Sequence, residues 1–112
     1  KVENMSKAPG TYNEVEGIFP DGQYTLVEAD RQVEKLGGSH GSRNIDIWKL
    51  KLDGTGKDFV RLTHFNDYEG FKASNPVIST DGRYMAFQLA SPHFSSWDWK
   101  RVAICGIKHL FH

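Results

Sequence analysis

The hydrophobic and polar residues of the chain form short apolar runs separated by aspartate-glycine turns. Runs of this length, rich in aromatic and branched residues and bounded by turn residues, are typical of β-strands. The first two runs flank Pro20-Asp21-Gly22, whose residues supply the backbone angles of a tight hairpin turn. Strands are predicted at residues 12–19, 23–29, 44–52 and 58–63, with a second turn at residues 53–57. Four consecutive antiparallel strands predict one meander sheet.

A second copy of the first hairpin follows later in the chain. Ile18-Phe-Pro-Asp-Gly-Gln-Tyr has a counterpart in Ile78-Ser-Thr-Asp-Gly-Arg-Tyr, 60 residues further on. Self-similarity at a fixed spacing is the signature of propellers, solenoids and other repeat arrays. Further strands are therefore predicted at residues 76–79, 83–90 and 102–107. At the same offset Cys105 and Ile107 fall on Ile45 and Ile47, which makes residues 102–107 a third strand of the second copy.

In the second strand of each copy, apolar residues occupy both odd and even positions, so both faces of the strand are apolar. Tyr24, Leu26 and Val27 lie in the first, and residues 84–90 are more apolar still. A strand without clean alternation is usually covered on both of its faces. This pattern predicts an all-β chain built from stacked sheets.

A polar, glycine-rich stretch at residues 30–43 separates the second and third strands, and it predicts a long hairpin loop. The preceding part of the sequence, residues 27–36, also fits a short helix. Residues 37–42, Gly-Gly-Ser-His-Gly-Ser, look superficially like a phosphate-binding loop. They lack the Lys-Ser/Thr pair and the helix start that such loops require, so a flexible loop is the better interpretation.

In their order, these motifs resemble the propeller repeats of the TolB-like family, which are relatives of WD-type repeats. The matching motifs are Pro20-Asp21-Gly22, Thr80-Asp81-Gly82, Ala29-Asp30-Arg31, Ile47-Trp48-Lys49-Leu50-Lys51-Leu52-Asp53-Gly54 and Arg61-Leu62-Thr63. The resemblance implies a linker or the end of a preceding element at residues 1–13, a first four-stranded blade at residues 14–65, and a partial second blade at residues 66–112 with an atypical C-terminus. The offset exceeds the ~40–45 residues of WD-type blades, and the excess lies in residues 30–43.

The resemblance implies a non-catalytic scaffold that binds a protein or a cell-envelope component, in a periplasmic or otherwise exported location. Similar propellers also serve as substrate-filtering domains of prolyl-oligopeptidase-type serine peptidases, and others act as polysaccharide lyases. A G-x-S-x-G elbow in the parent protein would favour the peptidase, and a channel histidine cluster with bound metal would favour the lyase. Propellers usually close with four to eight blades. We therefore expect one of two situations. Either the open faces of the blades make the chain self-associate, or the chain is an excerpt of a longer protein with more blades.

Composition limits the classes of partner. Lys and Arg together number 14, as do Asp and Glu, and the pI is about 7.1, so a nucleic-acid partner is not expected. No apolar run approaches the ~20 residues of a membrane helix, so membrane insertion is not expected either. The single cysteine, Cys105, cannot form an internal disulfide and is expected to be a small buried apolar residue.

Five residues are candidates for ligand binding. In propellers the first strand of a blade lies nearest the central channel, so the resemblance places Glu14, Glu16 and Asn75 there. Two carboxylates two positions apart on a strand face the same side, where they can bind a cation, perform acid–base work, or form a solvated acidic channel mouth. Trp97 and Trp99 are flanked by polar residues and are candidates for stacking on carbohydrate or contacting a protein. Trp48, inside an apolar strand, is expected in the core.

No catalytic residue, metal site or cofactor is predicted. The five histidines are His40, His64, His93, His109 and His112, and only the last two are close in sequence. Zinc sites usually combine such a pair with further ligands. A serine nucleophile would need a G-x-S-x-G elbow, which the sequence does not contain.

Overall fold

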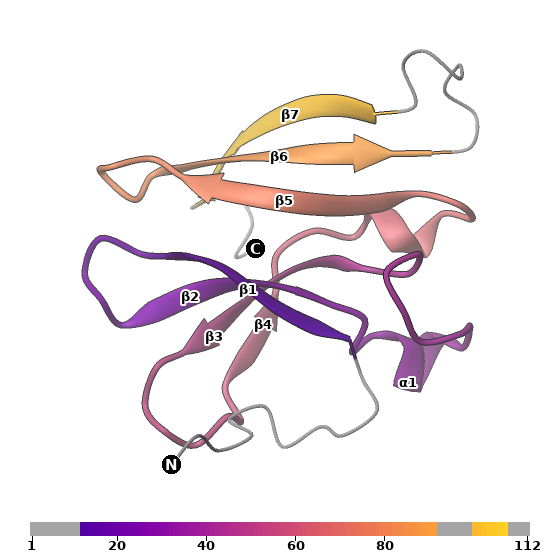
Figure 1. The fold of residues 1–112 in the computed structure, drawn as a ribbon, viewed down its shortest axis with the longest axis horizontal. Helices are drawn as coiled ribbons and strands as arrows, with labels where there is room; N and C mark the ends of the chain where they lie inside the picture. The colour runs from indigo at the N-terminus through magenta and orange to yellow at the C-terminus, as the bar shows by residue number, and fades with distance from the viewer. Residues whose placement is uncertain (1–11, 92–99, 108–112) are drawn as a thin grey trace.

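The computed structural model describes residues 12–91 and 100–107, which form two antiparallel sheets (Figure 1). Sheet A has the order β1 (Asn13–Ile18), β2 (Tyr24–Ala29), β3 (Asp46–Lys51) and β4 (Phe59–Arg61). Sheet B has the order β5 (Lys72–Ile78), β6 (Tyr84–Ala90) and β7 (Lys100–Gly106). The all-β class and the four-stranded meander predicted from the sequence are confirmed.

The long connection between β2 and β3 is anchored to sheet A by Asp30. The carboxylate of Asp30, which is fully buried, accepts the backbone N–H of Tyr12 at 2.9 Å and that of Gly41 at 2.7 Å. The connection contains a one-turn helix, α1 (Val33–Leu36), so a helix does form in part of residues 27–36. Residues 27–29 of that stretch belong to β2.

The two hairpins have the same local geometry. In each turn the aspartate carboxylate accepts the N–H of the residue two positions later, at 2.9 Å for Gln23 and 3.0 Å for Arg83. Gly22 and Gly82 have φ angles of 71° and 73°, which glycine adopts without steric cost. Both turns therefore form for the local reasons that the sequence predicts.

The first strand of each sheet also carries a β-bulge at corresponding positions. The register of β1 on β2 shifts between Val15 and Gly17, and that of β5 on β6 shifts between Ser74 and Val77. After the shift, Gly17 pairs with Leu26 and Val77 pairs with Ala86, so both partners obey the 60-residue offset. The backbone repeat therefore extends beyond the turns.

The third strands do not follow this offset, and the sequence alignment of Cys105 with Ile45 is wrong. Thr25 pairs with Leu50 in sheet A, and Met85, its counterpart in sheet B, pairs with Cys105. Cys105 therefore corresponds to Leu50, an offset of 55 residues. The reason is that the connection before β7 is five positions shorter than the one before β3.

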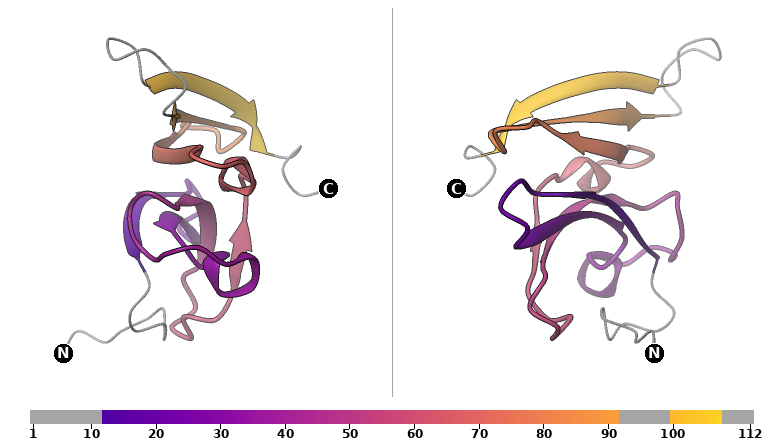
Figure 2. Two further views of the ribbon diagram at one scale, coloured as in Figure 1. Left: turned by 90° about the vertical axis from the view of Figure 1, so that its right-hand side faces the viewer. Right: turned by 60° about the vertical axis from the view of Figure 1, so that its left-hand side comes forward.

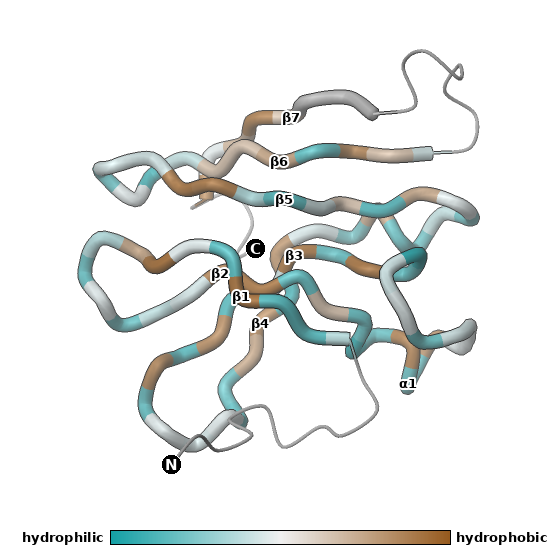
Figure 3. The backbone as a smooth tube through the Cα atoms, in the orientation of Figure 1, coloured by the Kyte–Doolittle hydropathy of each residue, from teal (hydrophilic) through white to brown (hydrophobic). Residues whose placement is uncertain are grey.

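The main hydrophobic core lies between the two sheets, which form two layers in both views of Figure 2. Leu26 and Ile47 enter it from the face of sheet A that we call its front, and Met85 and Phe87 enter from the back of sheet B. Figure 3 shows hydrophobic residues recurring along these strands. In both sheets, we call front the face on which Leu26 or its counterpart in sheet B lies. The back is the opposite face, on which Val27 or its counterpart lies.

Sheet A is also apolar on its back face. Val27, Ala29 and Leu50 form a second buried cluster there, and Trp48 and Phe59 pack against it with their ring centroids 6.4 Å apart. The expectation that β2 is covered on both faces is confirmed, and Trp48 is a packed residue as predicted. In β6 only the back face is well covered, because Tyr84 on the front is 49% exposed.

Candidate functional site

The hairpin of β1 and β2 brings three glutamates together on the front of sheet A. Glu14 and Glu28 are register partners, and Glu16 lies at the bulge. One carboxylate oxygen from each lies within 4.8 Å of the others. Glu14 is exposed, whereas Glu28 is only 3% exposed. The prediction that Glu14 and Glu16 face the same side agrees with this grouping.

Asn75 joins the three glutamates from sheet B. It lies at the bulge of β5 with a φ of 50°, an angle that asparagine tolerates better than most residues. Its backbone N–H donates a hydrogen bond to Oε1 of Glu28, and its side-chain Nδ2 donates to Oε1 of Gln88 at 2.7 Å. The structure thus brings three of the five predicted ligand-binding residues to one place, although Glu28 was not among the predictions.

Burial and mutual repulsion raise the pKa values of two of these carboxyl groups. Burial is the largest cause of the raised pKa of Glu28; the charges of Glu16 and Glu14 add to it, and the N–H of Asn75 opposes it. Burial and then the charge of Glu14 raise the pKa of Glu16, whereas its interaction with Glu28 lowers it. The raised pKa values mean that ionising Glu28 and Glu16 costs more free energy in the folded chain than in water.

Tyr12 extends the cluster towards the solvent. Its hydroxyl donates a 2.6 Å hydrogen bond to Oε2 of Glu14. That bond, followed by burial and by the charge of Glu14, raises the pKa of Tyr12 to about 12. Tyr12 consequently stays neutral at physiological pH and acts here as a hydrogen-bond donor. The site concentrates the negative charge of three carboxyl groups on the front of sheet A.

Replacing Glu28 with glutamine is expected to raise the free energy of unfolding at neutral pH, because it removes a buried charge that two neighbouring carboxylates repel. In the folded state the pKa of Glu28 lies above its ordinary value of 4.5, so the wild-type chain loses stability as the pH rises from 4.5 through the folded-state pKa. Glutamine carries no charge yet keeps an oxygen for the N–H of Asn75. In urea unfolding experiments from about pH 4 to pH 8, the free energy of unfolding of the variant should depend less on pH than that of the wild-type chain.

The repeat itself supports this substitution, because Gln88 occupies the position equivalent to Glu28 in sheet B. Glu69→Gln is the matched control, since Glu69 is exposed and outside the cluster. We expect the control to unfold with the same pH dependence as the wild-type chain. If Glu28→Gln did so as well, repulsion at Glu28 would not be the cause of that dependence.

The remaining sequence candidates are not part of this cluster. Trp97 and Trp99 lie outside the described residues, as do His93, His109 and His112. His40 contacts Asp30 at 3.0 Å, and His64 lies 3.9 Å from Asp67. In residues 12–91 and 100–107, the glutamate cluster is the only group of three or more potential metal-ligating side chains that lie close enough to share an ion.

Comparisons with known proteins add no assignment. No family model matches the chain, and no curated protein sequence is significantly similar to it. Within the described part of the chain, no helix is long and apolar enough to cross a membrane.

Proposed function

We propose that the chain is part of a TolB-like β-propeller and that it serves as a non-catalytic scaffold that binds a protein or a cell-envelope component. The observation that carries this proposal is the structural repeat. The bulged strand, the aspartate-glycine turn and the following strand recur at an offset of 60 residues, as the pairs Gly17–Leu26 and Val77–Ala86 illustrate. Stacked sheets that repeat in this way are the construction principle of propellers.

The way in which the sheets stack supports the same proposal. The front of sheet A packs on the back of sheet B, with Leu26 against the cluster that contains Met85. The front of sheet B carries apolar side chains that are open to solvent, since Val77 is 62% and Ile104 is 72% exposed. In this proposal the back of a further sheet of the same kind covers these side chains.

The glutamate cluster provides the surface for the partner in this proposal. In a propeller the first strands β1 and β5 border the channel, so Glu14, Glu16 and Asn75 would lie at its mouth. Their negative potential favours a basic partner surface and accelerates its encounter with the chain. An exported, periplasmic location belongs to the same proposal.

Binding to purified envelope components tests this role. Proteins that the immobilised chain retains from a cell-envelope extract would be identified, purified and titrated against the wild-type chain and two variants. Glu14→Gln/Glu16→Gln removes the charge and keeps the shape, and it should weaken binding about tenfold, a loss of ~1.4 kcal/mol. Glu69→Gln, an exposed control, should bind like the wild type.

Three results would contradict the proposal. If no purified component bound saturably, the scaffold would have no such partner. If both variants bound as tightly as the wild-type chain, the glutamates would not form the binding surface. Turnover of a peptide or a polysaccharide by the chain would support the alternative, a peptidase-associated or lyase propeller.

A further inference from the structure

Strand β7 is an edge strand of sheet B, whereas its counterpart in sheet A has a neighbour. The 55-residue offset makes residues 103–105 of β7 equivalent to residues 48–50 of β3. Those three residues of β3 are the ones that pair with β4: Trp48 with Arg61, Lys49 with Val60, and Leu50 with Phe59. In the described part of the chain, no strand occupies the corresponding place beside β7.

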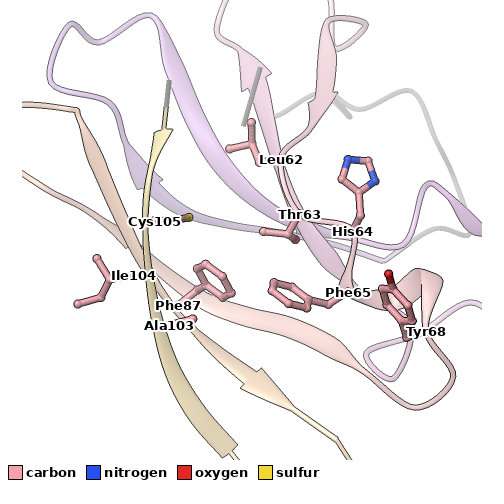
Figure 4. A pocket seen from close by; sticks show the side chains of 9 residues that line it. All are labelled: Leu62, Thr63, His64, Phe65, Tyr68, Phe87, Ala103, Ile104 and Cys105. Atoms are coloured by element: carbon pink, nitrogen blue, oxygen red, sulfur yellow. The ribbon is translucent and has the colours of Figure 1, made fainter. Parts of the chain in front are cut away.

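An apolar pocket of about 410 Å³ lies beside this open edge (Figure 4). Ala103, Ile104 and Cys105 of β7 line one side together with Phe87 of β6, the register partner of Ala103, and Phe65 lies across from Phe87. These three residues of β7 are therefore the ones whose counterparts in β3 pair with β4. Phe65, Ala103 and Cys105 also pack against the core between the sheets, so the pocket continues an established interface.

A difference between the two repeats explains why the pocket is open. In sheet A the indole of Trp48 packs edge-on against Phe59 of β4. At the equivalent position sheet B has Ala103, whose methyl group leaves most of that space unfilled. The missing volume therefore lies opposite the place where a fourth strand would put a side chain.

The backbone of this edge is suited to pairing. In sheet A the carbonyl oxygen of Ile47 accepts the N–H of Leu62 at 2.8 Å, and the N–H of Lys51 donates to the carbonyl oxygen of Asp58 at 3.0 Å. The equivalent residues of β7 are Val102 and Gly106. Open strand edges of this kind present unpaired N–H and C=O groups that template another strand.

We propose that β7 binds an extended peptide of a partner protein, which adds antiparallel to sheet B as its fourth strand. This strand site rests on the proposed function, the binding of a protein, and specifies where and how such a partner is held. Backbone hydrogen bonds to β7 supply affinity, and alternate side chains supply specificity. The two side chains opposite Cys105 and Ala103 enter the pocket, so both are large and apolar. The side chain between them lies beside Ile104 on the exposed front face.

A labelled peptide tests the strand site directly. The probe is Asp-Phe-Val-Phe-Leu-Thr, which is the sequence of residues 58–63 with phenylalanine in place of the arginine, so that an aromatic ring lies opposite Ala103. Fluorescence anisotropy should show saturable binding to the full wild-type chain. Cys105, the only cysteine and a pocket residue, reports occupancy, and its modification by a small disulfide reagent should slow at least tenfold.

Two methylated forms of the probe separate strand pairing from simple pocket filling. N-methylation at the valine and leucine, whose N–H groups would face β7, should weaken binding at least tenfold. N-methylation at the two phenylalanines, whose N–H groups would face away, should leave binding within about twofold, because one strand edge uses alternate residues. If both forms bound equally, or if Cys105 reacted at its free rate in the presence of peptide, the strand site would be refuted.

A variant of the protein tests the pocket independently. Ala103→Trp introduces the residue of sheet A and should fill the space, so the peptide should bind at least tenfold more weakly. If circular dichroism showed that this variant is unfolded, the two methylated peptides would decide. Dimers seen by light scattering that exclude the peptide would assign the edge to a second copy of the chain and refute the partner peptide.

The two proposals fail separately. A chain that binds an envelope component but not the peptide would refute the strand site and leave the proposed function standing. A chain that binds the peptide but no envelope component would refute the proposed role and leave the strand site standing.

Discussion

Replacing Asp46 with asparagine should lower the free energy of unfolding by about 3–5 kcal/mol, the cost of breaking a buried ion pair by removing one partner. The Asp46 side chain is fully buried at the start of β3. Its carboxylate accepts four hydrogen bonds, from Nη2 of Arg61 at 2.6 Å, Oγ1 of Thr63 at 2.7 Å, and the backbone N–H groups of Phe65 and Asn66 at 3.1 Å each. Burial nevertheless raises the pKa of Asp46 above its ordinary value.

Asparagine cannot satisfy this set of donors. It keeps one oxygen, and its NH2 group would face donors where the second carboxylate oxygen had accepted. Arg61, whose side chain is 12% exposed, would lose the shorter of its two ion pairs. The bonded groups join the end of sheet A to η1 (Phe65–Asp67), which leads into sheet B. The substitution should therefore loosen the connection between the sheets as well as β3 and β4.

Asp67→Asn is the matched control for this prediction. Asp67 also pairs with Arg61, at 2.9 Å, but its side chain is 42% exposed. Exposed ion pairs contribute at most about 1 kcal/mol, so the control should change stability by less than that. Urea unfolding followed by circular dichroism measures both variants. Equal costs for the two variants would show that burial of Asp46 does not determine the effect.

Local sequence signals predicted the hairpins well because their cause is local. The aspartate-glycine turns form at Gly22 and Gly82 with the positive φ angles that glycine allows. Register across a long connection has no such local signal. The shift of Cys105 from Ile45 to Leu50 depends on the length of a connection whose sequence differs between the repeats. That error also concealed the match between Trp48 and Ala103.

The candidate site was predicted in part for the same reason. Glu14, Glu16 and Asn75 followed from their strand positions and from the family resemblance, and the structure brings them together. Glu28 was missed because it lies within an apolar strand, where its burial depends on packing against sheet B. Its pairing with Glu14 in the predicted hairpin was the available signal. The pocket beside β7 depends on two sheets and a register, so no single motif indicates it.

Replacing Phe87 with alanine should lower the free energy of unfolding by about 3–5 kcal/mol, the usual range for an aromatic residue in a core. Phe87 is 4% exposed on the back of sheet B, and its ring centroid lies 5.7 Å from that of Phe65. Removing the ring enlarges the pocket beside β7 and takes apolar surface from the contact between the sheets. Small sheets need such packing for stability, so both sheets should unfold together.

Probes in both sheets can measure this cooperativity. Trp48 reports on sheet A by fluorescence in a chain with Trp97→Phe and Trp99→Phe, and Cys105 reports on sheet B by its reactivity. Both should give the same urea midpoint, and Phe87→Ala should lower both midpoints equally. Ile104→Ala, at a site that is 72% exposed, should change stability by no more than about 0.5 kcal/mol. An unchanged Trp48 midpoint in Phe87→Ala would mean that sheet A is stable without its contact to sheet B.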